Sequence, residues 1–106
     1  MRTYHHLGIP TDTPREGEAY LPEYKVYHFG YETSPYGIEW MRYEPGCPLP
    51  DIVQKIPHVA FKVDDLAAEI AGKDVIIPPN SPSPGVTVAF IVDNGAPIEF
   101  LQFDKK

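Results

Sequence analysis

The sequence predicts an α+β fold, mostly β, in which a module of one strand, one helix and three strands occurs twice. Two observations predict this fold. The 106 residues include 13 prolines and eight glycines, which cut the chain into short segments and favour short strands over long helices. The two halves of the chain also match in chemical type and in spacing. A chain of this length suits a single domain at 1–106, with module 1 at approximately 1–50 and module 2 at approximately 55–104.

Short stretches of apolar or alternating residues mark the expected strands. They lie at 3–9, 25–31 and 38–44 in the first half, and at 57–63, 75–77, 86–92 and 98–103 in the second. The last two strands are separated by Asn94-Gly95, which predicts a tight hairpin because both residues tolerate positive φ.

One helix is expected in each module, with different lengths. In the second module it spans 66–71, where Asp64 or Asp65 can cap the free N–H groups of the first turn. In the first module Thr13-Pro14-Arg15-Glu16 is typical of a helix start, with proline at the first helical position. A glycine and a proline follow soon after, so this helix is expected to be shortened to about two turns.

The repeat is clearest at the first and last strands of each half. His6-Leu7-Gly8-Ile9 aligns with His58-Val59-Ala60-Phe61, and 38–44 aligns with 98–104 in chemical type at nearly every step. The long strand, the hairpin and the final strand keep the same spacing in both halves. In each half, one histidine on the first strand and one glutamate on the last strand are polar residues within otherwise apolar strands.

Alternation along a strand predicts which way these residues turn. Their apolar neighbours form the face that the helix covers. The four polar residues therefore turn toward the opposite, inner face: His6, Glu39, His58 and Glu99. The same alternation places five further residues on this face, where we expect them to line a pocket: Tyr4, Met41, Tyr43, Leu101 and Phe103. Gly8 and Ala60 are small, which leaves open volume beside the imidazoles.

Two other histidines need separate interpretations. A register slip of one residue would turn His5 inward in place of His6, although His6 alone matches His58 in the repeat. His28 aligns with Val88 and has no histidine counterpart in the second half. We therefore interpret His28 as a structural residue or as part of the cavity wall.

The paired modules, their two histidine-containing openings, Val63-Asp64-Asp65-Leu66 and the closing Ile98-Glu99-Phe100-Leu101 together resemble the vicinal oxygen chelate superfamily. That superfamily includes glyoxalase, methylmalonyl-CoA epimerase, extradiol dioxygenases and bleomycin-resistance proteins. The resemblance implies that the two sheets curl around a metal-binding cavity, within one chain or across two. It also implies that the first and last strands of each module supply the ligands, which by position are His6, Glu39, His58 and Glu99.

Two imidazoles and two carboxylates suit a divalent ion such as Zn, Ni, Fe, Mn or Co. The resemblance implies a glyoxalase-like lyase or isomerase whose small substrate chelates the ion through neighbouring oxygens, with Glu39 or Glu99 moving the proton. One alternative is a metal-free protein that binds a small molecule, as the antibiotic-resistance relatives do. Another is an extradiol-type dioxygenase with two histidines and one glutamate, against which a fourth ligand at Glu39 would argue.

Composition narrows the range of partners and locations. Nine basic against fifteen acidic residues give a net charge of −6, so nucleic acid is an unfavourable partner. The longest apolar run, 88–92, is far below the roughly 20 residues that a membrane helix needs. A single cysteine, Cys47, and the lack of a secretory signal predict a cytoplasmic protein. With only three arginines, a site for anionic glutathione or CoA is not evident.

The shortened first helix also predicts a homodimer. It would leave the outer face of the first sheet poorly covered, and an exposed apolar face usually marks an interface. By alternation that face carries Leu7, Ile9, Ile38 and Trp40.

Overall fold

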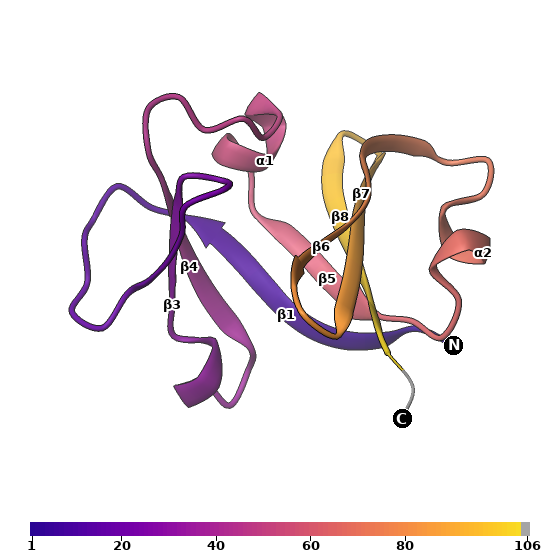
Figure 1. Ribbon diagram of the computed structural model, residues 1–106, viewed down its shortest axis with the longest axis horizontal. Coiled ribbons are helices and arrows are strands. Elements are labelled where there is room, and N and C mark those ends of the chain that lie inside the picture. The colour runs from indigo at the N-terminus through magenta and orange to yellow at the C-terminus, as the bar shows by residue number, and fades with distance from the viewer. Residues whose placement is uncertain (105–106) are drawn as a thin grey trace.

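The computed structural model describes residues 1–104, which form one eight-stranded mixed sheet with two short α-helices (Figure 1). The last two residues of the predicted domain, 105 and 106, lie outside the described residues. The elements of the first module are β1 (Thr3–Pro10), β2 (Ala19–Leu21), β3 (Val26–Phe29), the 3₁₀ turn η1 (Tyr31–Thr33) and β4 (Ile38–Tyr43). They are followed by α1 (Asp51–Lys55), β5 (His58–Lys62), α2 (Leu66–Ile70), β6 (Asp74–Ser83), β7 (Val86–Asp93) and β8 (Ala96–Phe103).

The strand order β2-β3-β4-β1-β5-β8-β7-β6 is symmetric about the junction of β1 and β5. In each module the first strand runs parallel to the last strand, with equivalent registers. Gly8 is the partner of Glu39 in the first module, and Ala60 is the partner of Glu99 in the second. The repeat is thus present in the strand pairing itself, and the predicted α+β fold of two modules with a curled sheet is confirmed.

The two modules meet along β1 and β5, which pair antiparallel (Figure 1). In this ladder His6 lies opposite Ala60, and Gly8 lies opposite His58. Each histidine therefore faces the small residue of the other strand. At Gly8 the space is already filled, because an added Cβ would lie 2.2 Å from Cε1 of His58. Glycine at this position is what allows the His58 imidazole to lie over β1.

A β-bulge interrupts this ladder near its start. Tyr4 pairs with Phe61 and His6 pairs with Ala60, so two steps along β1 match one step along β5, and His5 is the additional residue. The bulge shifts the alternation of β1, which places Tyr4 on the face opposite to His6. The prediction that Tyr4 shares the inner face is therefore wrong. Its hydroxyl instead donates to the carbonyl oxygen of Tyr36 at 2.8 Å.

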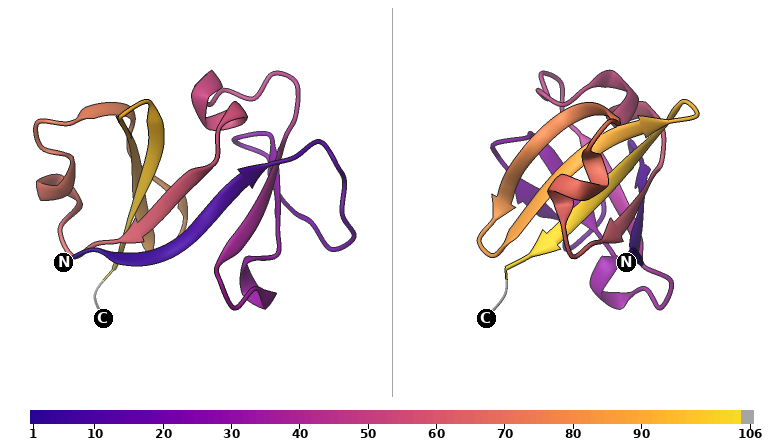
Figure 2. Two further views of the ribbon diagram at one scale, coloured as in Figure 1. Left: turned by 180° about the vertical axis from the view of Figure 1, so that it is seen from behind. Right: turned by 90° about the vertical axis from the view of Figure 1, so that its right-hand side faces the viewer.

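The second module has the helix that the sequence predicts. Asp65 is the N-cap of α2, and its carboxylate accepts a hydrogen bond from the Ala68 N–H at 3.2 Å. Helix α2 lies over the outer face of β7 and β8 (Figure 2, right). Leu66 packs there in a buried cluster with four other apolar residues: Val63, Ala89, Ile91 and Phe100. This cluster is the main core of the second module.

The first module lacks its predicted helix. In the part of the chain that the structure describes, the segment 11–18 contains only a bend and a turn. Gly17 in that turn has a φ of 88°, which interrupts a right-handed helix. The segment is held in another way, because the Arg15 guanidinium lies 4.7 Å from the Trp40 ring centroid. The outer face of this sheet is thus covered in part by a loop.

Three further differences from prediction have local causes. Strand β3 is shorter than expected, because Lys25 has a φ of 51° in the preceding turn and the η1 turn follows. Strand β6 is longer than the expected strand at 75–77 and includes the proline-rich segment that follows it. It is an edge strand with three register shifts, which accommodate prolines that cannot donate to the ladder. Helix α1 was not predicted; it follows Pro50 and buries Val53.

Within residues 1–104, no helix is long and apolar enough to cross a membrane. Both α-helices have five residues.

Candidate metal centre

A cavity of about 590 Å³ lies between the modules and is lined by residues of both. Its polar end contains all four histidines of the sequence and the two repeated glutamates. Its other walls are mainly apolar. They are built from both modules and α1, and include Leu21, Val26, Leu49, Val53, Ile77, Val86 and Val88.

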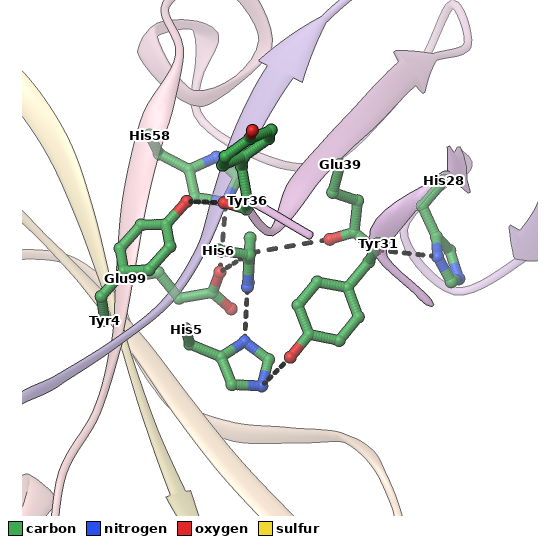
Figure 3. Close-up of polar contacts among 9 residues, drawn as sticks. All are labelled: Tyr4, His5, His6, His28, Tyr31, Tyr36, Glu39, His58 and Glu99. Carbon is green, nitrogen blue, oxygen red and sulfur yellow. Dashed lines mark hydrogen bonds and ion pairs between the residues drawn. The ribbon is translucent and has the colours of Figure 1, made fainter. Parts of the chain in front are cut away.

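Three of the predicted ligand residues converge at the polar end (Figure 3). Oε1 of Glu99 lies 3.2 Å from Nε2 of His6 and 3.1 Å from Nε2 of His58. The exposed fractions are 5% for His6, 2% for His58 and 9% for Glu99. One donor atom from each residue lies within 4.8 Å of the other two. Two imidazole nitrogens and one carboxylate oxygen form a donor set that fits a divalent transition metal.

Glu39 lies beside this group. Its Oε1 is 3.6 Å from Nε2 of His6, while its Oε2 is 3.2 Å from Nδ1 of His28. With bonds of about 2.1 Å, two donors to one ion are at most about 4.2 Å apart. Glu39 does not belong to the group whose donor atoms lie within 4.8 Å of one another. The structure thus unites three of the four predicted ligand residues and places the fourth next to them.

His5 lies behind His6 and connects it to Tyr31 (Figure 3). The Nδ1 atoms of His5 and His6 are 2.7 Å apart, and Nε2 of His5 is 3.2 Å from the Tyr31 hydroxyl. When Nε2 of His6 is used for an ion, its Nδ1–H donates to His5, and the Nε2–H of His5 donates to Tyr31. The bulge therefore brings both histidines to the cavity in different roles, with His6 in the donor group and His5 as its support.

His58 is fixed by packing. Its ring lies against the backbone of Gly8 on one side and meets the Phe90 ring edge-on, with centroids 5.0 Å apart. The small residue and the aromatic ring leave the imidazole little freedom, and its Nε2 points at Glu99.

The charges of the donor group are strongly coupled. Burial raises the pKa of Glu99, but hydrogen bonds from His58 and His6 outweigh it and lower the pKa to about 2. Burial lowers the pKa of His6, but its hydrogen bond to Glu99 and the charges of Glu99 and Glu39 raise it above the ordinary value. Burial, followed by the nearby charge of His6, lowers the pKa of His5. The group thus holds protons where an ion would otherwise sit.

Four of the five pocket residues predicted from alternation line the cavity. Met41, Tyr43, Leu101 and Phe103 line the cavity, whereas Tyr4 lines a separate surface depression with Tyr36. Burial, and then the charge of Glu99, raises the pKa of Tyr43, so its hydroxyl stays protonated. His28 lines the cavity, in agreement with its interpretation as a wall residue.

Several residues of the cavity wall were not predicted from the sequence. Tyr24 and Asn80 lie in opposite modules, and the Tyr24 hydroxyl donates to Oδ1 of Asn80 at 2.9 Å. Val53 enters the wall through α1, and the only sequence signal for that helix is Asp51 directly after Pro50.

No lysine or arginine is among the described residues that line the cavity. The charged side chains of its wall, apart from the histidines, are those of Glu32, Glu39 and Glu99. Lys62 is not part of the wall, although its Nζ lies 5.7 Å from the ring centroid of the wall residue Phe103. The interior is therefore apolar with an acidic end.

The fold places two repeated modules around a buried group of two histidines and one glutamate. The chain is similar in structure to a hypothetical protein, BH1468, from Bacillus halodurans C-125. The two share 20% sequence identity at a TM-score of 0.74, over 99% of this chain and 96% of that one. It is also similar to methylmalonyl-CoA epimerase from Mycobacterium tuberculosis, with 15% identity and a TM-score of 0.66, over 96% of this chain and 88% of that one. No known family profile and no curated protein matches the sequence.

Proposed function

We propose that this protein is a metal-dependent lyase or isomerase of the vicinal oxygen chelate superfamily, acting on a small substrate with two neighbouring oxygens. The observation that carries the proposal is the buried convergence of His6, His58 and Glu99 at one end of the cavity between the modules. Exposed acidic clusters are common without an ion, but these three residues are buried and aimed at one another. The two histidines come from the equivalent first strands of the two modules, and Glu99 comes from the last strand of the second.

The donor set suits Zn, Ni, Fe, Mn or Co, and three protein donors leave positions for substrate oxygens. When bound, such an ion supplies a Lewis acid that stabilises negative charge on those oxygens. The support of His6 by His5 matches the way in which proteins orient a metal-binding imidazole through its second nitrogen.

Glu39 is the proton-transfer group that the geometry favours. Glu99 accepts from both imidazoles, whereas Oε1 of Glu39 lies beside the donor group without being part of it. In the proposed reaction Glu39 takes a proton from the carbon next to a carbonyl; the electron pair of the C–H bond forms a C=C bond, and the π pair of the carbonyl moves to its oxygen. Return of the proton to the same or the neighbouring carbon completes a redox-neutral reaction.

The cavity wall favours an uncharged, largely apolar substrate. Its only non-histidine charges are acidic, and they would repel a carboxylate or phosphate. A CoA thioester, the ligand type named in the epimerase of similar fold, therefore finds no basic wall residue in this cavity.

Deuterium exchange tests this function without knowledge of the full reaction. The protein is loaded with Mn²⁺, Co²⁺ or Zn²⁺ and incubated in D₂O with hydroxyacetone and acetoin, which are uncharged 2-hydroxy ketones. We expect NMR to show metal-dependent deuterium incorporation next to the carbonyl, lost in His58→Ala and in Glu39→Gln but kept in Glu32→Gln. A metal-loaded protein that exchanges none of these protons would contradict the proposal.

A second candidate, an extradiol-type dioxygenase, is favoured by the composition of the donor group. Two histidines and one carboxylate with open positions are the donor set of non-haem Fe(II) oxygenases. Oxygen uptake with Fe(II)-loaded protein and catechol separates the candidates. Oxygen uptake that persists in Glu39→Gln would favour the dioxygenase. A wild-type protein that takes up no oxygen but catalyses deuterium exchange would favour the isomerase or lyase.

A further inference from the structure

Glu39 and Glu99 hold equivalent positions in the two modules but have different neighbours. Each is the register partner of the small residue two positions after a histidine, Gly8 for Glu39 and Ala60 for Glu99. Nevertheless Glu99 contacts both His6 and His58, whereas of these two histidines Glu39 contacts only His6, and at the longer distance of 3.6 Å. A residue that is not repeated must therefore account for the different contacts of the two carboxylates.

The difference lies on the neighbouring strand. His28 of β3 pairs with Met41, and the equivalent pair in the second module is Val88 with Leu101. His28 therefore stands where the second module has Val88, which has no polar side-chain atom. Glu99 finds no partner at that position and turns to the two imidazoles. Glu39 instead has Nδ1 of His28 at 3.2 Å from its Oε2 (Figure 3).

We infer that His28 is a positioning residue that holds Glu39 beside the metal group and outside the coordination of the ion. This inference rests on the proposed metal-dependent function and assigns different roles to two residues that the repeat makes equal. Glu99 is the ligand. Glu39 is kept as a free carboxylate facing the position of the substrate, with its Oε2 held by Nδ1 of His28.

Binding of Co²⁺ to the full chain tests the inference, because the visible spectrum of Co²⁺ reports its coordination. We expect Glu99→Gln to weaken Co²⁺ binding by more than about 100-fold, beyond the range for loss of an outer partner. Glu39→Gln is expected to weaken it by less than about tenfold, below that range. Glu32→Gln is the matched control, because Glu32 also lines the cavity but lies outside the donor group.

His28 itself is tested by a double-variant cycle. In His28→Ala, Glu39 is released, so we expect the Co²⁺ spectrum to change toward a higher coordination number. The change should disappear in His28→Ala combined with Glu39→Gln. His28→Gln can still donate to Glu39 and is expected to keep the wild-type spectrum, which distinguishes a lost hydrogen bond from a disturbed fold.

Two results would overturn the inference while leaving the proposed function in place. One is an equal loss of Co²⁺ affinity in Glu39→Gln and Glu99→Gln. The other is a folded His28→Ala protein, as judged by circular dichroism, with an unchanged Co²⁺ spectrum. A wild-type protein that binds no Co²⁺ would instead contradict the metal-dependent function, and the inference with it.

Discussion

Gly8 and His58 are register partners, and the imidazole of His58 occupies the space where a side chain at residue 8 would lie. A Cβ at Gly8 would be 2.2 Å from Cε1 and 2.7 Å from Nε2 of that ring. The absence of a side chain at residue 8 of one module thus makes room for a candidate metal ligand of the other.

The first prediction follows from this contact. Gly8→Ala forces the His58 ring to shift, so we expect metal affinity to fall by at least about tenfold, as when a ligand loses its orientation. Calorimetric titration with Zn²⁺ measures this. Gly85→Ala is the matched control. Its added Cβ meets nothing within 4 Å, but its φ of 85° makes the variant strained, so stability should fall while metal affinity does not. Equal Zn²⁺ affinity in Gly8→Ala and the wild type would contradict the prediction.

The second prediction concerns His5. His5→Phe keeps a ring that can stack on Tyr31, as the imidazole does with centroids 4.8 Å apart, but it removes the hydrogen bond to His6. We expect Zn²⁺ affinity to fall about 10–100-fold, the range for loss of an outer partner of a histidine ligand. His6→Ala, which removes the ligand itself, should lower it further. If His5→Phe removes binding and His6→Ala keeps it, the assignment of the two histidines is reversed.

A third prediction is the pH dependence of metal binding. In the metal-free protein the hydrogen bond to Glu99 and the charges of Glu99 and Glu39 raise the pKa of His6 above its ordinary value, so protons compete with the ion at higher pH than for a free histidine. Metal affinity should therefore rise from pH 6 to pH 8. The stability of the metal-free protein should instead fall over this pH range. The contribution of a raised histidine pKa to stability is present below about 6.5 and is lost as pH rises through the folded-state pKa. Zn²⁺ titrations and thermal unfolding in EDTA at several pH values measure the two effects, and an affinity that does not change between pH 6 and pH 8 would contradict the first.

The fourth prediction is the homodimer. The four residues expected on the outer face of the first sheet are half-buried, and Arg15 lies over Trp40, so that face is covered only in part. We expect light scattering at micromolar concentration to give twice the chain mass of 11.9 kDa. Trp40→Glu should shift the mass toward the monomer while leaving Zn²⁺ binding unchanged, because Trp40 is not part of the cavity wall. A wild-type monomer at that concentration would contradict the prediction.

The repeat explains why so much of the fold could be predicted from the sequence. Equivalent histidines and glutamates in the two halves identified strands β1, β4, β5 and β8, and their registers agree with the alignment. A repeated pattern is informative because each half tests the other. It also selected His6, His58 and Glu99 before their distances were known.

The failures lie where the chain departs from regular alternation. The bulge at His5 adds one residue to a strand, and no sequence signal distinguishes it from an unbroken strand, so Tyr4 was placed on the wrong face. The missing first helix has a suitable start but no stable continuation after Gly17. The contact of His28 with Glu39 depends on the pairing of β3 and β4, and the second module offers no counterpart from which to infer it.

The central claim is that one chain binds one divalent ion through His6, His58 and Glu99. The most direct measurement is the metal content of protein purified without chelators, followed by calorimetric titration with Zn, Ni, Fe(II), Co and Mn. The account predicts about one ion per chain in the wild type and loss of that ion in His58→Ala, with circular dichroism showing that the variant remains folded. A wild-type protein that stays free of metal in all five titrations would contradict the claim and favour a protein that binds its small molecule without an ion.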